Sequence, residues 1–170
     1  MGQLGSYIRD EIIFKKELYV YIFGLRKSGK TTVLHKLKVG EQAEETPTFL
    51  YSCETIKHKS IYFHLIDTEW ISYNNLNHAV IFVVSSSYNS YFYEERYELN
   101  RWINNHLFRN SPILVLANKQ DFPNAISPEE VAHRLGMYDL MDRKWFVCGT
   151  CGLTGEGLYE GLDWLARNLS

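Results

Sequence analysis

A short apolar run leads directly into a glycine-rich loop near the start of the chain, and this pair constrains the fold most strongly. Leu18–Phe23 (LYVYIF) reads as a buried strand because it is apolar without interruption. It continues into Gly24-Leu-Arg-Lys-Ser-Gly29-Lys30-Thr31, which matches G-x-x-x-x-G-K-[ST], and then into a helical segment. In this strand–loop–helix context the pattern predicts a phosphate-binding loop.

The residue types of this loop indicate its chemistry. Glycines let backbone N–H groups turn inward around phosphates, and the following helix N-terminus adds partial positive charge. We expect Lys30 to reach the outer phosphates and the Thr31 hydroxyl to coordinate Mg²⁺. Arg26 and Lys27 add two cations at the loop tip, where they either contact phosphate or are merely solvated. The loop therefore predicts a nucleoside triphosphate without identifying its base.

A second motif, Asn118-Lys119-Gln120-Asp121, indicates the base. It directly follows the apolar run Ile113–Ala117. In N-K-x-D, the Asp121 carboxylate accepts hydrogen bonds from guanine N1–H and its 2-amino group, which adenine does not offer in that arrangement. The Lys119 stem covers the base, and Asn118 ties this loop to the phosphate loop. A wrong base leaves a buried carboxylate unpaired, so GTP and GDP are favoured over ATP.

Apolar runs alternate with helical patterns along the rest of the chain, which is typical of a layered α/β domain. Val80–Val84, Ile113–Ala117 and Trp145–Cys148 are predicted to be buried parallel strands because they are continuously apolar. Tyr51–Lys57 and Ile61–Ile66 are predicted to form a hairpin, with one antiparallel strand at the sheet edge.

Helix signals are also present. Ser127-Pro-Glu-Glu130 fits a capping box, and Gly136 stands where a C-terminal cap belongs. Two helices are predicted to present one apolar stripe each to the core. The stripes comprise Leu99, Trp102, Ile103 and His106 in the middle of the chain, and Leu158, Leu162, Leu165 and Leu169 near its end.

Length and composition exclude several classes of protein. A chain of 170 residues suits one domain, and 45% hydrophobic with 22% charged residues is typical of a globular protein. The formal net charge of -2 gives no reason to expect nucleic acid as a partner. No apolar run is long enough to cross a bilayer, and the N-terminus lacks a secretory pattern. We therefore expect a cytoplasmic location.

The three cysteines do not predict a disulfide framework, because they are sparse and odd in number. Cys148-Gly-Thr-Cys151 fits C-x-x-C, which is found in redox pairs and in half zinc sites. No second pair of ligands is spaced to complete a zinc site. A strand end and loop with two small thiols is the favoured interpretation.

Several stretches resemble the Arf and Arf-like branch of small GTPases. They are GLRKSGKTTVLHKLKVGE, ETPT, ANKQDFPNA and GEGLYEGLDWLARNL. The resemblance implies a P-loop NTPase (small G-protein) α/β fold, in which a six-stranded, mostly parallel sheet carries helices on both faces. Residues 16–170 would form a single G domain. Thr48 would be the switch threonine that closes on Mg²⁺ and the γ-phosphate. Thr150-Cys151-Gly152 would support guanine O6, with Gly152 where the family usually has alanine.

These expectations define a set of ligand-binding positions. Mg²⁺ would be held by Thr31, Thr48 and, through water, Asp67. The expected nucleotide-binding residues are Gly24, Leu25, Arg26, Lys27, Ser28, Gly29, Lys30, Thr31, Thr32, Thr48, Asn118, Lys119, Asp121, Cys151 and Gly152.

The N-terminus resembles the same branch. Met1-Gly2-Gln-Leu-Gly-Ser6 fits the pattern for N-myristoylation of Gly2, and residues 1–15 would form an amphipathic helix with an apolar stripe at Leu4, Ile8 and Ile12. An ordinary N-terminal helix is the alternative. One myristoyl chain binds membranes only marginally, so the stripe would assist it. The resemblance implies a GTP-dependent membrane switch in vesicle-mediated or intracellular protein transport, peripheral on a Golgi or endosomal membrane.

The chain departs from the branch at Asp67-Thr68-Glu69-Trp70-Ile71, where members carry D-x-G-G-Q. Asp67 is retained, but Trp70 replaces the glycine that meets the γ-phosphate, and Ile71 replaces the glutamine that orients water. An isoleucine side chain can neither donate nor accept a hydrogen bond. The second switch is also several residues shorter than in the family. Arg26, at the position of the family's loop aspartate, and Glu69 are the only substitutes that the sequence offers for catalysis.

Three functions remain open on the sequence. The first is a regulatory GTPase with slow or impaired hydrolysis, which the resemblance implies would act as a monomer with an exchange factor and effectors. The second is a pseudo-GTPase module that holds guanine nucleotide and acts as a scaffold. The third, a small-metabolite kinase, has no residues to propose for an acceptor site.

Overall fold

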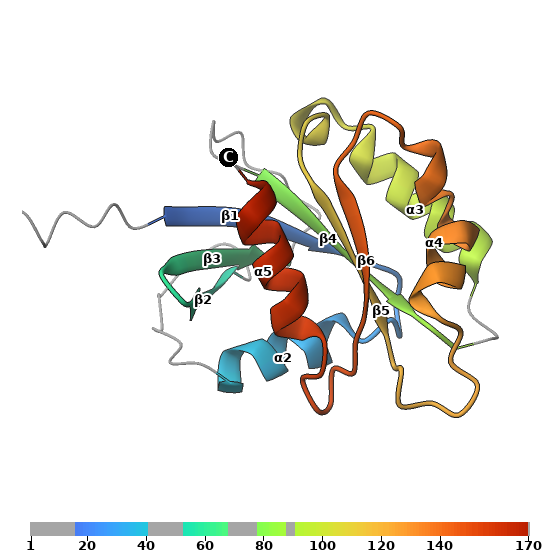
Figure 1. Cartoon of the computed structure of the whole chain (residues 1–170), viewed down its shortest axis with the longest axis horizontal. Coiled ribbons are helices and arrows are strands. Elements are labelled where there is room, and N and C mark those ends of the chain that lie inside the picture. Colours follow the sequence, from blue (N-terminus) through green and yellow to red (C-terminus); the bar gives the residue numbers. More distant parts are fainter. Residues whose placement is uncertain (1–15, 41–52, 68–77, 88–90, 170) are drawn as a thin grey trace, which may run out of the picture.

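The computed structural model describes residues 16–40, 53–67, 78–87 and 91–169. These residues form a six-stranded sheet with strand order β2-β3-β1-β4-β5-β6 (Figure 1). The strands are β1 (Lys16–Phe23), β2 (Cys53–His58), β3 (Ile61–Ile66), β4 (His78–Ser85), β5 (Ile113–Asn118) and β6 (Trp145–Gly149).

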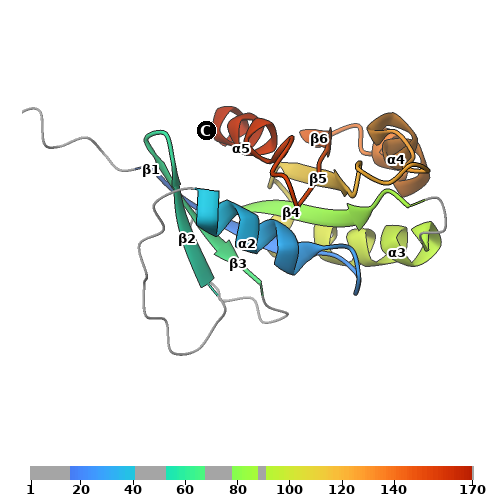
Figure 2. The ribbon, with the colours of Figure 1, turned by 90° about the horizontal axis from the view of Figure 1, so that it is seen from below.

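The pairing of the strands confirms the predicted topology. Among the described strands, only β2 is antiparallel to its neighbour, β3, and it lies at the edge of the sheet. The other neighbouring pairs are all parallel. Figure 2 shows the β2–β3 hairpin at the opposite end of the molecule from α3 and α4. All six residues of β5 are buried, as expected for a strand covered on both faces.

Helices cover both faces of the sheet. The helices are α2 (Lys30–Gly40), α3 (Phe92–Ile103), α4 (Pro128–Leu135) and α5 (Leu158–Asn168), with short 3₁₀ helices η1 (His106–Phe108) and η2 (Met137–Asp139). Alternate residues of β1 point to opposite faces. Leu18, Val20 and Ile22 belong to the core that includes α2 and α5 residues, whereas Tyr21 and Phe23 belong to the core that includes α3 and α4 residues.

Two helix predictions have different outcomes. The α5 stripe is confirmed, since Leu158, Leu162, Leu165 and Leu169 are all buried. The middle stripe is wrong at its last member, because α3 ends at Ile103 and His106 begins η1 with an exposed side chain. Asn104 is the C-cap of α3, and the Asn105 side chain then accepts from the Leu107 N–H over 3.0 Å. This new cap redirects the chain before a further helical turn can form.

The signals around α4 are confirmed in part. The Ser127 hydroxyl accepts from the Glu130 N–H over 3.2 Å, and Gly136 is a left-handed C-cap with φ of 73°. The described contacts of the Glu130 carboxylate run to Arg134, whose Nε donates to it over 2.7 Å. Of the two hydrogen bonds of a capping box, the one accepted by the serine hydroxyl is thus present, while the glutamate stabilises the helix through an i,i+4 ion pair.

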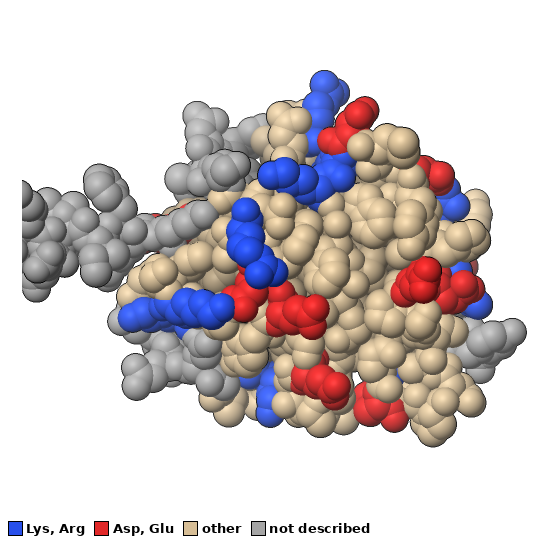
Figure 3. All heavy atoms as spheres, in the orientation of Figure 1, with Lys and Arg blue, Asp and Glu red and all other residues tan. Residues whose placement is uncertain are grey.

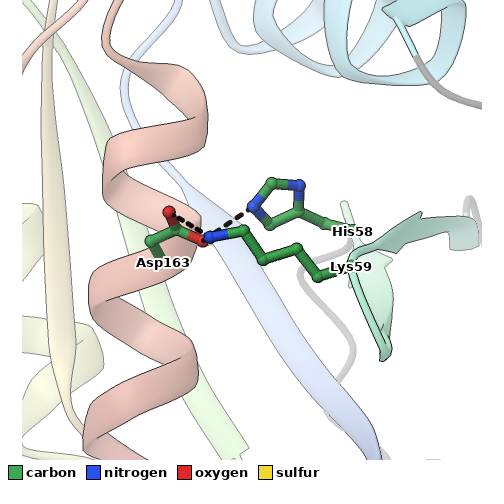
Figure 4. A network of polar contacts seen from close by, with 3 residues as sticks. All are labelled: His58, Lys59 and Asp163. Atoms are coloured by element: carbon green, nitrogen blue, oxygen red, sulfur yellow. Dashed lines mark hydrogen bonds and ion pairs between the residues drawn. The ribbon is translucent and has the colours of Figure 1, made fainter.

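A polar contact joins the tip of the hairpin to α5 (Figure 4). Lys59 Nζ lies 2.6 Å from both oxygens of Asp163, and His58 Nε2 lies 2.8 Å from Asp163 Oδ1. Lys59 has φ of 57°, which places it in the left-handed region at the turn. Figure 3 shows acidic and basic side chains interspersed on the face that carries α5.

Candidate nucleotide site

The phosphate loop leaves β1 at Phe23 and turns sharply at Gly24. Gly24 has φ of 147°, and a Cβ added there would lie 2.2 Å from the carbonyl oxygen of Val83. Lys27 and Gly29 also have positive φ values, of 69° and 96°. A side chain at Gly24 would collide with β4, so the close approach of loop and strand requires glycine.

Polar contacts hold this loop as a cradle. Lys30, the first residue of α2, donates from Nζ to the Gly24 carbonyl oxygen over 3.1 Å. The Ser28 N–H donates to the Leu25 carbonyl oxygen over 3.2 Å. Ser28 Oγ is buried without a hydrogen-bond partner in the described structure. An unpaired hydroxyl and the open end of α2 inside a glycine-lined turn fit an anionic ligand such as phosphate.

Asn118, at the end of β5, joins three segments that are distant in sequence. Its Nδ2 donates to the Ser28 carbonyl oxygen over 3.0 Å, and its Oδ1 accepts from the Gly152 N–H over 2.9 Å. Thr150 Oγ1 lies 3.5 Å from the same oxygen. Because β1 and β5 are parallel to β4, their carboxyl ends meet at one edge of the sheet. The predicted link between Asn118 and the phosphate loop is therefore present.

Lys119 makes a second link. It has φ of 68°, and its Nζ donates to the Lys27 carbonyl oxygen over 2.6 Å. The same ammonium lies 5.7 Å from the centre of the Phe122 ring. The aliphatic stem of Lys119 is consequently held along the loop, as expected of a side chain that covers a base.

Gln120, which the motif treats as variable, has a structural role that sequence reasoning missed. Its Nε2 lies within hydrogen-bond distance of Ser86 Oγ (2.9 Å), the Ala117 carbonyl oxygen (3.2 Å) and the Ile126 carbonyl oxygen (3.1 Å). The amide thus closes the loop that carries Asp121 onto the end of β4. The sequence did offer one signal: the side chain between Lys119 and Asp121 is an amide, which can both donate and accept hydrogen bonds.

A small cavity of about 160 Å³ lies between these loops. Asp121 lines it and is exposed, in keeping with a carboxylate that receives a ligand. Cys151, next to Gly152 in the chain, is buried. The lining comprises Gly29, Thr32, Asn118, Lys119, Asp121, Phe122, Gly152 and Leu153. Glycine and apolar walls around one carboxylate suit a flat, polar-edged ring such as a purine.

A larger cavity of about 350 Å³ adjoins the phosphate loop on its α3 side. It brings together Lys30, Asp67 and Arg26, which the sequence placed at the phosphate and Mg²⁺ end of the site. Trp102 of α3 forms another wall and stacks on Phe23 with ring centroids 3.9 Å apart. Thr31, one residue after Lys30, is exposed in the first turn of α2.

The C-x-x-C pair consists of two buried, free thiols. Cys148 Sγ lies 3.3 Å from the Gly157 carbonyl oxygen. Burial, followed by the neighbouring Glu160 carboxylate, raises the pKa of Cys148 to about 12. A thiol that stays protonated at neutral pH is a poor nucleophile and a poor metal ligand, which supports the structural interpretation.

Several predicted positions lie outside the described residues. They are the N-terminal segment with Gly2, Thr48 of the first switch, and Glu69, Trp70 and Ile71 of the second. Asp67 is the last described residue before the second switch, directly after β3.

The fold and the two joined loops define a phosphate-loop nucleotide-binding α/β domain. The model of the ADP-ribosylation factor family matches residues 4–169, so the chain belongs to the Arf family of small GTPases. A similar solved structure is the Arl6 (BBS3) small GTPase from Trypanosoma brucei, which was determined with the nucleotide analogue GppNp bound. The TM-score is 0.74 at 28% sequence identity, covering 89% of this chain and 96% of that one.

Proposed function

We propose that this protein is an Arf-like switch that binds GTP and GDP together with Mg²⁺. The observation that carries the proposal is Asn118, whose side chain bonds both to the Ser28 carbonyl oxygen and to the Gly152 N–H. This contact joins the phosphate loop, the N-K-x-D loop and the Thr150–Gly152 loop, which supports a single binding site. The presence of GppNp in the similar Arl6 structure supports a nucleotide as the ligand.

Guanine is the base that the described residues fit best. Asp121 provides a carboxylate at the cavity of about 160 Å³, and the Lys119 stem lies along the same loop. A carboxylate accepts from guanine N1–H and the 2-amino group, whereas adenine has an acceptor and a C–H at these two positions. Selection would therefore come from leaving Asp121 unpaired when adenine is bound.

Mg²⁺ fits the oxygen donors at the other end of the site. Thr31 stands in the first turn of α2, and Asp67 lines the same cavity as Lys30. Hydroxyl and carboxylate oxygens are the ligands that Mg²⁺ prefers, and Mg²⁺ neutralises charge on the outer phosphates when bound. Thr48 would complete the set from the first switch. Arg26, whose side chain is exposed, also lines this cavity and adds a positive charge there.

Hydrolysis is proposed to be slow or impaired. Trp70 and Ile71 stand where the family has glycine and glutamine, and Ile71 cannot orient a water molecule. The same observation favours a second candidate function, in which the protein holds guanine nucleotide as a scaffold without turnover. The two functions share the binding site and differ only in the chemical step.

The remaining part of the proposal is membrane association. Myristate on Gly2 and the stripe Leu4, Ile8 and Ile12 would attach the protein to a Golgi or endosomal membrane, where it would serve vesicle-mediated protein transport as a monomer. An exchange factor and effectors would act on it, as on its family. Within the residues that the structure covers, no helix combines the length and apolarity needed for a membrane span.

Nucleotide competition and single-turnover hydrolysis on purified protein with Mg²⁺ test this proposal. GTP and GDP should displace a fluorescent guanine nucleotide at least about a hundredfold better than ATP does. Equal displacement by ATP would refute the assignment of the base. Bound GTP should remain intact far longer than in a glutamine-bearing relative, and equal turnover would refute the role given to Ile71. Complete absence of turnover would favour the scaffold.

Mass spectrometry of the protein expressed in eukaryotic cells tests the lipid separately. The N-terminal peptide should carry myristate on Gly2, and Gly2→Ala should abolish both the modification and flotation with vesicles. An unmodified or merely acetylated N-terminus would refute this part of the proposal while leaving nucleotide binding untouched.

A further inference from the structure

The larger cavity beside the phosphate loop has a charged pair of α3 in its wall. Glu98 and Arg101 both line this cavity of about 350 Å³, together with Lys30 and Asp67. The sequence motifs of the candidate site include neither of the two α3 residues. Because these charges face the same cavity as Lys30, they act on the anion that Lys30 binds.

Aromatic contacts hold α3 against the start of the phosphate loop. The guanidinium carbon of Arg101 lies 5.1 Å from the centre of the Trp102 ring, and this ring stacks on Phe23 with the centroids 3.9 Å apart. Phe23 directly precedes Gly24, whose carbonyl oxygen accepts from Lys30 Nζ over 3.1 Å. These successive contacts place the Arg101 guanidinium close to the start of the loop.

The ion pair between Arg101 and Glu98 is one that a stronger anion can replace. Arg101 Nη1 lies 3.4 Å and 3.3 Å from the two Glu98 oxygens, which is longer than the about 2.8 Å of a strong charged hydrogen bond. The Arg101 side chain is 56% exposed, and exposed pairs of this kind contribute little to stability. A phosphate group offers more charge and accepts two parallel bonds from a guanidinium, so exchange of the carboxylate for phosphate is favourable.

We infer that Arg101 is a specificity-determining residue that distinguishes GTP from GDP, because it exchanges the Glu98 carboxylate for the outermost phosphate. The inference rests on the proposed binding of guanine nucleotide. Arg101 shares its cavity with Lys30 and Asp67, whereas Asp121 lines the cavity assigned to the base. A triphosphate places its additional charge at the Lys30 end of the site, and GDP ends short of it. Arg101 therefore stabilises the bound triphosphate, while Glu98 repels it and competes for the guanidinium.

The test compares the affinities for GppNp and for GDP, both with Mg²⁺, by competition against a fluorescent guanine nucleotide. The full-length proteins are the wild type, Arg101→Ala, Glu98→Gln and the control Arg109→Ala, which removes an exposed arginine that lines neither cavity. Arg101→Ala should bind GppNp about tenfold more weakly and GDP within about twofold of the wild type. Glu98→Gln should bind GppNp about threefold more tightly, because the competing carboxylate is removed. The control should match the wild type for both nucleotides.

A measurement on the wild type keeps the test independent of how well the variants fold. The guanidinium signals of Arg101, followed by NMR, should shift when GppNp binds and remain in place when GDP binds. Unchanged GppNp affinity in Arg101→Ala, equal losses for the two nucleotides, or guanidinium signals that respond alike to both would overturn the inference. Failure of the wild type to bind any guanine nucleotide would instead refute the proposed function.

Discussion

Asn118 on β5 donates from Nδ2 to the Ser28 carbonyl oxygen over 3.0 Å, across 90 positions of sequence. Its Oδ1 accepts from the Gly152 N–H on the opposite side, over 2.9 Å. All three residues are buried, so water cannot replace these bonds without a rearrangement. One side chain thus fixes the relative positions of the loops proposed to hold the phosphates and the base.

Asn118→Ala should weaken both stability and nucleotide affinity. It leaves the Ser28 carbonyl oxygen and the Gly152 N–H without this partner in a buried place, which costs about 1–3 kcal/mol for each group that finds no substitute. We expect at least about a tenfold loss in affinity for GDP, measured by fluorescence, and a lower melting temperature. Asn110→Ala, at an exposed position, is the control. Wild-type binding by Asn118→Ala would show that the loops keep their positions without this bridge.

Asp121→Asn should change the base that is selected. The asparagine amide donates where the carboxylate accepted, so it pairs poorly with guanine N1–H and better with the O2 carbonyl of xanthine. GDP affinity should fall by more than about a hundredfold while xanthosine diphosphate gains. Competition against a fluorescent nucleotide measures both. Unchanged preference for guanine would mean that another residue contacts the base edge.

Two glycines near Asn118 should respond differently to alanine. A Cβ on Gly29 would lie 2.3 Å from Asn118 Nδ2 in a backbone with φ of 96°, whereas a Cβ on Gly152 would meet only side-chain atoms at 3.3–3.4 Å. Gly29→Ala should therefore abolish detectable binding, and Gly152→Ala should change stability by less than about 1 kcal/mol. Thermal melting and nucleotide binding of the pair check this. Equal losses would contradict the geometry.

The sequence predicted the sheet well because its central parallel strands are buried on both faces and leave a continuous apolar pattern, although in the edge strand β6, also predicted to be buried, only Cys148 is fully buried. The runs at β1, β4, β5 and β6 all fall within strands, and the hairpin follows from its turn at Lys59-Ser60. Helix ends were harder to predict. His106 continued the spacing of the α3 stripe, but the Asn104-Asn105 pair ended the helix through caps whose effect depends on the local backbone.

The candidate site was predictable where a motif fixes side-chain chemistry and not where burial decides the role. Asn118 could be placed against the phosphate loop from the sequence, whereas Gln120 occupies a position that the motif leaves free. Glu95 falls on the buried face of α3, between Phe92 and Leu99, yet a charged residue in the sequence YEERYEL is typical of a solvated face. Only tertiary packing shows that its carboxyl group lies inside.

Asp163→Asn should loosen the hold of α5 on the hairpin. The hydrogen bond from Lys59, and then that from His58, hold the pKa of Asp163 below its usual value despite some opposing desolvation. Because the pKa is lowered on folding, the contact stabilises the protein when the pH is above 3.8, the pKa of the unfolded state. This stabilisation is lost as the pH falls through the lower pKa of the folded state. Because the carboxylate is partly exposed, we expect less than about 1 kcal/mol.

Hydrogen exchange can locate this effect. Amides at the β2–β3 turn should exchange faster in Asp163→Asn than in wild type at neutral pH, and the difference should shrink in acid. Asp142→Asn, at an exposed position, should leave the turn unchanged. Unaltered exchange at the turn in Asp163→Asn would mean that apolar packing alone holds the hairpin.

Glu95→Gln should stabilise the nucleotide-free protein at alkaline pH. Since burial raises the pKa of Glu95 from 4.5 to about 7, the folded state binds more protons than the unfolded state in this window. The contribution of neutral Glu95 is fully present below about pH 4.5, decreases as the pH rises towards 7, and is lost above it. Between these two limits the free energy of unfolding changes by about 3 kcal/mol. Urea unfolding at several pH values should show that the wild type loses this free energy of unfolding and that Glu95→Gln does not. If the free energy of unfolding depends on pH in the same way for both proteins, the carboxyl group is in contact with water and the prediction is wrong.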